Sequence, residues 1–102
     1  MNLSQITAEY FSPYTGQMFS VQRKGIVVAE LQLEQVFVSS ISNNNFRQQF
    51  SLYFKSTGMT AFSDGLFTLS HPECGDLPQI YINRVLPDQA GDQTPYYQIS
   101  FN

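Results

Sequence analysis

The chain has 102 residues, of which 42% are hydrophobic and 15% aromatic, so it can form one domain with its own core and is too apolar to be a disordered segment. Only 13% of the residues are charged and the net charge is −3, which gives a polar, uncharged exterior that repels its own copies weakly. We expect no binding to nucleic acid, because that needs clustered cations and the basic residues are few and scattered, namely Arg23, Lys24, Arg47, Lys55 and Arg84.

We expect no secretion signal in the first residues. They lack the basic segment and the apolar stretch that a signal peptide needs. No apolar run approaches about 18 residues, so we expect no membrane insertion. We therefore expect a protein that starts in the cytoplasm, with export by another route left open. Cys74 is the single cysteine and has no partner for an internal disulfide, so it does not indicate the redox compartment.

The first predicted element is a short helix. Thr7 is a suitable N-cap, Glu9 would lie in the first turn, and Pro13 would end the helix. Ile6, just before the cap, could pack against Phe11. The helix would then close one end of a sheet and bury Phe11.

Two strands follow, with a tight turn between them. Residues 18–22 form the first strand and residues 26–39 the second, which is the longest β-prone run of the chain. Apolar residues of this run alternate at first but occupy both faces from Val36 onward. This change indicates a β-bulge near Glu34 or Gln35, or a switch to burial on both faces.

Residues 46–55 alternate between two faces and so predict a half-buried β-strand. Its inner face would carry Phe46, Gln48, Phe50, Leu52 and Phe54. Its outer face would carry Arg47, Gln49, Ser51, Tyr53 and Lys55.

Three more strands are predicted at residues 66–71, 77–86 and 96–102. His71 and Pro72 close the first of these, because proline cannot continue a central ladder. Strands at such close spacing predict an all-β, mainly antiparallel fold. We expect residues 1–102 to form a single domain, a small six- to seven-stranded barrel or sandwich with one short N-terminal helix.

The sequence offers no catalytic set. His71 is the only histidine, and a triad would have to combine it with Cys74 and with Asp76 or Glu73, all in one tight turn. Nucleophile and base normally converge from separate elements around a pocket. A zinc site needs three or four ligands, and one histidine with one cysteine is too few. We therefore expect no enzyme, metal or cofactor, and interpret His71 as a strand-end histidine that bonds a turn carbonyl.

Tyrosines on the outer faces of strands are the main candidates for recognition. Tyr53, Tyr81 and Tyr96, with Arg47 and Lys55, form the predicted interaction surface, which would suit a protein partner or a sugar. The alternative is structural, since each tyrosine could cover a barrel end or pair across strands.

Four segments together resemble a family of small bacterial domains of unknown function. They are Thr-Ala-Glu-Tyr-Phe from Thr7, Phe-Ser-Leu-Tyr-Phe from Phe50, His-Pro-Glu-Cys-Gly from His71, and the final Phe-Asn. Members of this family are often encoded beside proteins with phage-tail-collar-like domains. The resemblance implies a place in a tail-like or filamentous surface assembly, and it brings no catalytic residue. Cys74 departs from the small or aliphatic residue usual at its position.

The leading hypothesis is a non-enzymatic structural or protein-interaction subunit of a multi-protein assembly, such as a phage-tail-like fibre or a bacterial surface filament. A protein partner or self-association would follow from it, and the mature protein would be part of a virion or surface appendage. One alternative is a small module that binds a glycan or another ligand, with tyrosines lining a barrel mouth. Another is an inhibitor or immunity protein that blocks a basic enzyme with its acidic surface.

Overall fold

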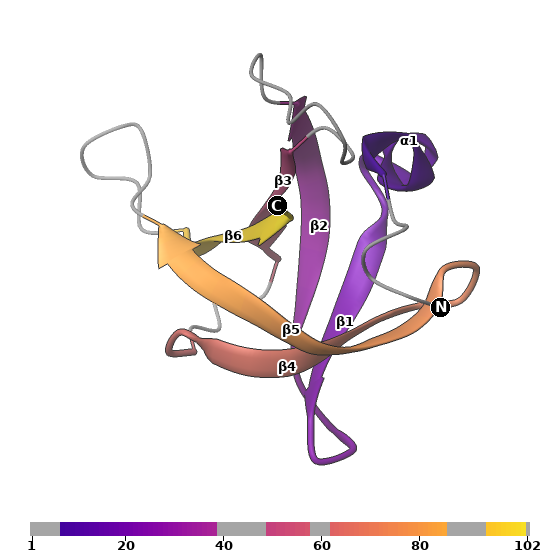
Figure 1. The fold of residues 1–102 in the computed structure, drawn as a ribbon. Coiled ribbons are helices and arrows are strands. Elements are labelled where there is room, and N and C mark those ends of the chain that lie inside the picture. Colours follow the sequence, from indigo (N-terminus) through magenta and orange to yellow (C-terminus); the bar gives the residue numbers. More distant parts are fainter. Residues whose placement is uncertain (1–6, 39–48, 58–61, 86–93, 102) are drawn as a thin grey trace.

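The strands of the chain close into an antiparallel barrel (Figure 1). The computed structural model describes residues 7–38, 49–57, 62–85 and 94–101. Six strands follow one another around the barrel in the order β1-β2-β3-β6-β5-β4. The all-β prediction is confirmed, and of the two predicted arrangements the barrel is the one observed.

The described elements match the predicted ones closely in position. In chain order they are α1 (Ala8–Phe11), the 3₁₀ turn η2 (Ser12–Tyr14), β1 (Met18–Arg23), β2 (Ile26–Val38), β3 (Phe50–Ser56), β4 (Gly65–His71), β5 (Gly75–Val85) and β6 (Tyr96–Phe101).

The helix begins where the sequence predicts, but not through the expected side-chain cap. Thr7 occupies the N-cap position with an extended backbone, and its side chain makes no capping hydrogen bond. The helix passes into η2, which contains Pro13, and the Ser12 hydroxyl donates to the carbonyl of Ala8 over 3.1 Å. Ile6, the predicted partner of Phe11, lies outside the described residues.

β1 and β2 form a hairpin with a two-residue turn. Arg23 pairs with Ile26, and both residues between them have positive φ, 52° at Lys24 and 78° at Gly25. Such a turn matches the twist of the flanking strands. Further along β2, the register with β3 shifts between Leu33 and Gln35, so the predicted bulge is confirmed.

β3 keeps the alternation seen in the sequence. Phe50, Leu52 and Phe54 are buried, and the residues between them are partly exposed. Residues 46–48, the predicted beginning of this strand, lie outside the described residues. The strand is confirmed from Phe50 onward.

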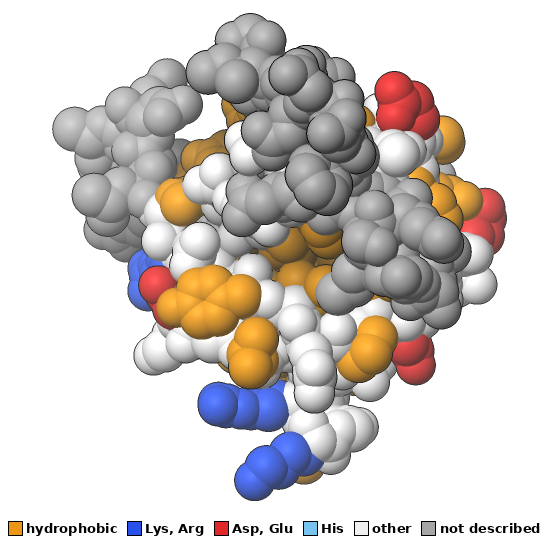
Figure 2. All heavy atoms as spheres, viewed as in Figure 1, with side chains coloured by type: hydrophobic (Ala, Val, Ile, Leu, Met, Phe, Trp, Pro, Cys, Tyr) orange, Lys and Arg blue, Asp and Glu red, His pale blue; other side chains and the backbone are white. Residues whose placement is uncertain are grey.

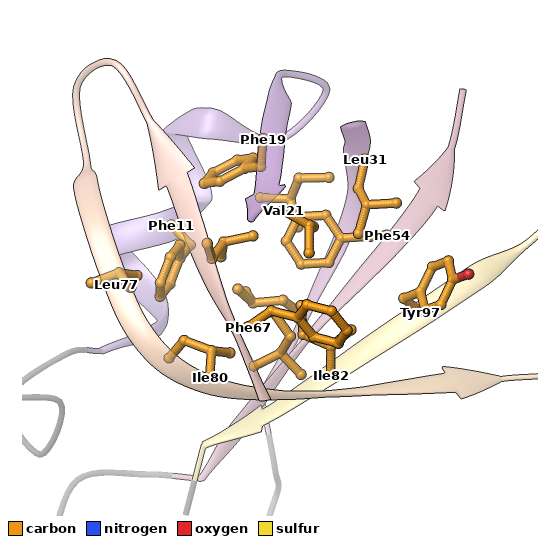
Figure 3. Close-up of a cluster of buried hydrophobic side chains, with 14 of the residues drawn as sticks. Phe11, Phe19, Val21, Leu31, Phe54, Phe67, Leu77, Ile80, Ile82 and Tyr97 are labelled. Atoms are coloured by element: carbon orange, nitrogen blue, oxygen red, sulfur yellow. The ribbon is translucent and has the colours of Figure 1, made fainter. Parts of the chain in front are cut away.

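Side chains fill the barrel, as is usual for one this small (Figure 3). The largest fully buried side chains are Tyr97, Phe11, Phe19, Phe54, Leu31, Leu33, Leu52, Leu69, Ile82, Ile99 and Val21. Phe11 of α1 enters the core from one end, with ring centroids 6.1 Å from Phe50 and 5.7 Å from Phe101. Because side chains fill the interior of the barrel, the outer faces of its strands are the surfaces available for recognition.

Candidate functional site

Two of the predicted surface tyrosines lie side by side on the outside of the barrel. In the pairing of β3 with β6, Tyr53 is opposite Gln98 and Lys55 is opposite Tyr96, so the two tyrosines are diagonal neighbours on one face. Their rings are parallel to within 4°, with centroids 5.4 Å apart. Tyr53 and Tyr96 thus form a single stacked unit.

Phe37 of β2 extends this unit. Its side chain is 49% exposed, and its ring meets Tyr53 edge-on with centroids 6.3 Å apart. We call Phe37, Tyr53 and Tyr96 the aromatic stripe. The sequence analysis did not select Phe37. The bulge was the signal that could have found it, because a register shift decides which of the apolar residues beyond it face outward.

An ion pair borders the stripe. The Lys55 Nζ lies 3.2 Å from a carboxylate oxygen of Glu34, the residue at the β2 bulge. Both side chains are about one-third exposed. Lys55 is therefore at the predicted surface, but its charge is largely balanced by Glu34. Pairs this exposed contribute little to stability.

Tyr81, another of the predicted surface residues, does not join the stripe. Tyr81 of β5 pairs with Leu66 of β4, and both side chains are more than half exposed on a different part of the barrel wall. No aromatic contact found in the described part of the chain links Tyr81 to Tyr53 or Tyr96. Arg47 lies outside the described residues. The structure thus brings together three of the five predicted residues.

A shallow depression of about 200 Å³ adjoins the stripe. Phe37 and Ser51 form part of its wall, together with Ser100 of β6. The hydroxyl oxygens of Ser51 and Ser100 lie 3.5 Å apart across the two strands. The stripe is therefore bordered by uncharged polar groups that can donate or accept hydrogen bonds.

His71 is held as part of the core. It is buried, its Nδ1 accepts the backbone N–H groups of Glu73 at 3.0 Å and Cys74 at 3.4 Å, and its Nε2 lies 2.8 Å from Oε1 of Gln17. Because Nδ1 accepts, Nε2 carries the proton and donates it to Gln17. The expected bond to a turn carbonyl was wrong, since the histidine instead satisfies turn N–H groups, while its position at the strand end was right.

Cys74 has the properties of a poorly reactive thiol. Its pKa is raised, first by burial and second by the neighbouring Glu73 carboxylate, while a hydrogen bond with Tyr14 acts in the opposite direction. A nucleophilic cysteine needs a lowered pKa. Both nitrogens of His71 are occupied by the contacts above, which leaves neither aimed at the thiol as a base.

The described residues show neither a metal-binding cluster nor a membrane-spanning helix. No group of three or more His, Cys, Asp or Glu residues in the described ranges is placed to hold a metal ion. In the same part of the chain, no helix has the length and apolarity to cross a membrane.

Comparison with known proteins places the chain in a family. It belongs to a domain of unknown function (DUF6916), whose family model matches residues 6–101. No curated protein matches the chain. No solved structure matches it either.

Proposed function

We propose that this member of the DUF6916 family is a non-enzymatic structural or interaction subunit of a multi-protein assembly, and that the aromatic stripe binds a neighbouring protein. The observation that carries the proposal is the stripe itself, three adjacent aromatic rings on one outer face. Aromatic side chains are enriched in the buried centres of protein interfaces, where they supply much of the binding energy.

The stripe is suited to binding because its rings are already ordered. Tyr53 and Tyr96 stand on paired strands and stack on each other, and Phe37 packs edge-on against Tyr53. A partner that covered them would fix few additional side-chain rotamers. Because the loss of side-chain freedom opposes association, this arrangement favours affinity.

Side-chain contact is a better route to a partner here than addition of a strand. Every strand of the barrel pairs with a neighbour on both sides, so no strand is a full-length edge. Strand addition needs such an edge. Among the outer faces of the described strands, the stripe is therefore the surface that we assign to binding.

The proposed setting is a phage-tail-like fibre or a bacterial surface filament. The resemblance noted for the sequence motifs supports it, as does the low charge of the chain, because subunits with a net charge of −3 repel one another weakly. A virion or surface appendage would then be the place where the protein acts.

The test is a double variant, Tyr53→Ser with Tyr96→Ser, assayed by biolayer interferometry against purified products of the adjacent genes. Buffers of about 0.5 M salt suppress contacts between exposed charges, so the apolar contribution dominates. We expect at least about a tenfold loss of affinity, because interface aromatics are frequent hot spots. Tyr81→Ser is the matched control and should bind like the wild type.

Two results would contradict the proposal. One is wild-type affinity in the double variant, with a circular dichroism spectrum that shows it to be folded. The other is wild-type protein that binds none of the neighbouring products and remains monomeric at every concentration in light scattering.

Glycan binding is the second candidate function. The uncharged polar groups beside the stripe support it, namely the hydroxyls of Ser51 and Ser100 and the amide of Gln98 opposite Tyr53. Sugars would stack on the rings and bond to these groups. The tyrosines concerned lie on the outer wall rather than at a barrel mouth. A glycan array that gives no signal for the wild type would remove this candidate.

A further inference from the structure

The hairpin between β1 and β2 carries a basic depression on an otherwise acidic molecule. Arg23 and Lys24 both line a hollow of about 400 Å³. Phe67 of β4 also lines it, and the guanidinium carbon of Arg23 lies 5.4 Å from the centroid of the Phe67 ring. This contact orients Arg23 through a cation–π interaction and leaves its N–H groups able to bind an anion. We call this region the basic end.

The backbone around the basic end is unusual. Lys24 and Gln79 are the non-glycine residues with positive φ in the described ranges, at 52° and 55°, and both line the same depression. Glycine or asparagine adopts this conformation more readily than lysine or glutamine. The chain therefore places two long polar side chains around one hollow at positions that would suit smaller residues. At Lys24 the two-residue turn of the hairpin requires this conformation, and Gln79 adopts it at the register shift between β4 and β5.

Apolar side chains surround the same hollow. Leu66, which lines it, is 57% exposed, and Ile26 next to the turn is 68% exposed. Figure 2 shows basic and hydrophobic side chains close together at the lower end of the molecule, where Figure 1 places the hairpin. A partner for this end would need carboxylates beside apolar groups.

The opposite end of the barrel offers that chemistry. His71, at the end of β4, bonds to Gln17 just before β1, and Tyr10 of α1 donates to the carbonyl of Cys74. The β4–β5 turn and α1 therefore both lie where β1 begins, whereas the hairpin lies where β1 ends. The six residues of β1, at roughly 3.3 Å per residue, separate the two by about 20 Å.

Carboxylates and apolar groups are exposed together at this second end. Glu9, Glu73 and Asp76 are exposed there, and so are Pro13 and Pro72. Asp76 accepts a hydrogen bond from the Ser70 hydroxyl, 2.6 Å away. In the described part of the chain, the ion pair found is that of Lys55 with Glu34, and it belongs to neither end. We call Glu9, Glu73 and Asp76 the acidic end.

We propose that copies of this chain associate end to end, with the acidic end of one copy docked on the basic end of the next. Opposite charges at the two ends favour this orientation over head-to-head contact. Because the two surfaces differ, each copy leaves one end unoccupied, and the contact can repeat into a filament unless the rotation closes a ring. This inference rests on the proposed function and specifies a contact between subunits. A nucleic acid or an anionic membrane is a poorer occupant of the basic end than a second copy, because this end has only two cations and the chain has a net charge of −3.

Sedimentation velocity over a concentration series at about 50 mM salt tests the contact, with Lys24→Glu and Glu73→Lys as the two charge reversals. We expect the wild type to sediment faster as its concentration rises, and less so at about 0.5 M salt. Each variant alone should associate at least about tenfold more weakly. An equimolar mixture of the two variants should regain association. The unchanged acidic end of the Lys24→Glu protein can then dock on the unchanged basic end of the Glu73→Lys protein, and the two reversed charges also attract each other. Arg84→Glu is the control, since it changes the net charge as Lys24→Glu does but Arg84 does not line the hollow.

Three results would overturn the inference. The wild type could be monomeric at every concentration, Lys24→Glu and Arg84→Glu could weaken association equally, or the mixture of the two charge reversals could fail to regain association. The variants are compared as folded proteins, as judged by circular dichroism. Recovery in the mixture reports only on the two ends, whereas the tyrosine variants in high salt report only on the stripe. Failure of the inference is thus distinguishable from failure of the proposed function.

Discussion

Cys74 and two nearby tyrosines are held by the fold in their neutral forms. Burial raises the pKa of Cys74, and the Glu73 carboxylate adds to the effect. The pKa values of Tyr10 and Tyr14 are raised as well, again first by burial and then by the charge that Cys74 would carry. All three groups become anions on losing a proton, so the folded chain retains these protons to higher pH than the unfolded chain does.

We predict that the free energy of unfolding falls as the pH rises through about 8.5, where an unfolded thiol is half ionised. In that range the native state binds more protons than the unfolded state, so the slope of stability against pH is negative. The stabilisation is present in full at pH values below the pKa values of the unfolded chain. It is lost as the pH rises through the pKa values of the folded chain. Urea titrations at pH 7, 8, 9 and 10 would measure it. Cys74→Ala should flatten the first part of the decline, and an unchanged slope would contradict the role given to the thiol.

His71 illustrates which properties of a residue can be predicted from the local sequence alone. The His-Pro pair predicted a strand end, and β4 does end at His71. The hydrogen-bond partner was not predictable in the same way, because Gln17 is 54 residues distant along the chain and meets the histidine only when β1 and β4 pair. Local sequence therefore indicated the position of the ring but not its contacts.

At the scale of elements, α1 closes the barrel. Phe11 has no exposed surface and packs near both Phe50 and Phe101, which stack on each other with centroids 4.7 Å apart. Tyr10 ties the same helix to the β4–β5 turn through its hydroxyl. A helix of four residues has little stability alone, so these contacts hold it in place.

We predict that Phe11→Ala lowers the free energy of unfolding by about 3–5 kcal/mol, because it removes a fully buried aromatic ring and leaves a cavity. Tyr10→Phe, which removes only the hydrogen bond to Cys74, should lower it by about 1 kcal/mol. Urea unfolding followed by circular dichroism would measure both. Equal losses in the two variants would show that Phe11 does not have the special role assigned to it.

The elements themselves were largely predictable, whereas their outer surfaces were only partly so. Alternation of side chains predicted β3 and its buried face, and uneven alternation in β2 predicted the bulge. The aromatic stripe depends in addition on register, because Tyr53 and Tyr96 become neighbours only through the offset of β3 against β6. Register between strands far apart in the sequence cannot be obtained from either strand alone.

At the scale of the whole molecule, the barrel is built from pairings distant in sequence. β1 pairs with β4, and β3 pairs with β6, so closing the sheet requires long loops to form before their contacts are made. This is also why a barrel and a sandwich could not be distinguished from the sequence. Six strands with the same alternation suit both, and the decision lies in which strands meet.

We predict one cooperative unfolding transition and refolding in milliseconds to seconds, the range of small all-β proteins with distant contacts. The chain has six tyrosines and no tryptophan, so stopped-flow tyrosine fluorescence is a direct probe. Circular dichroism should give the same urea midpoint. Microsecond refolding, or midpoints that differ between the two probes, would contradict a single core that forms as a unit.

The position of β6 has a consequence for synthesis on the ribosome. β6 follows the other described strands along the chain, yet in the barrel it lies between β3 and β5. While residues 96–101 remain in the exit tunnel, β3 and β5 each lack a neighbour, and the backbone groups that β6 will bond are open to other nascent chains. The emerging polypeptide is therefore most exposed to mispairing just before residues 96–101 appear.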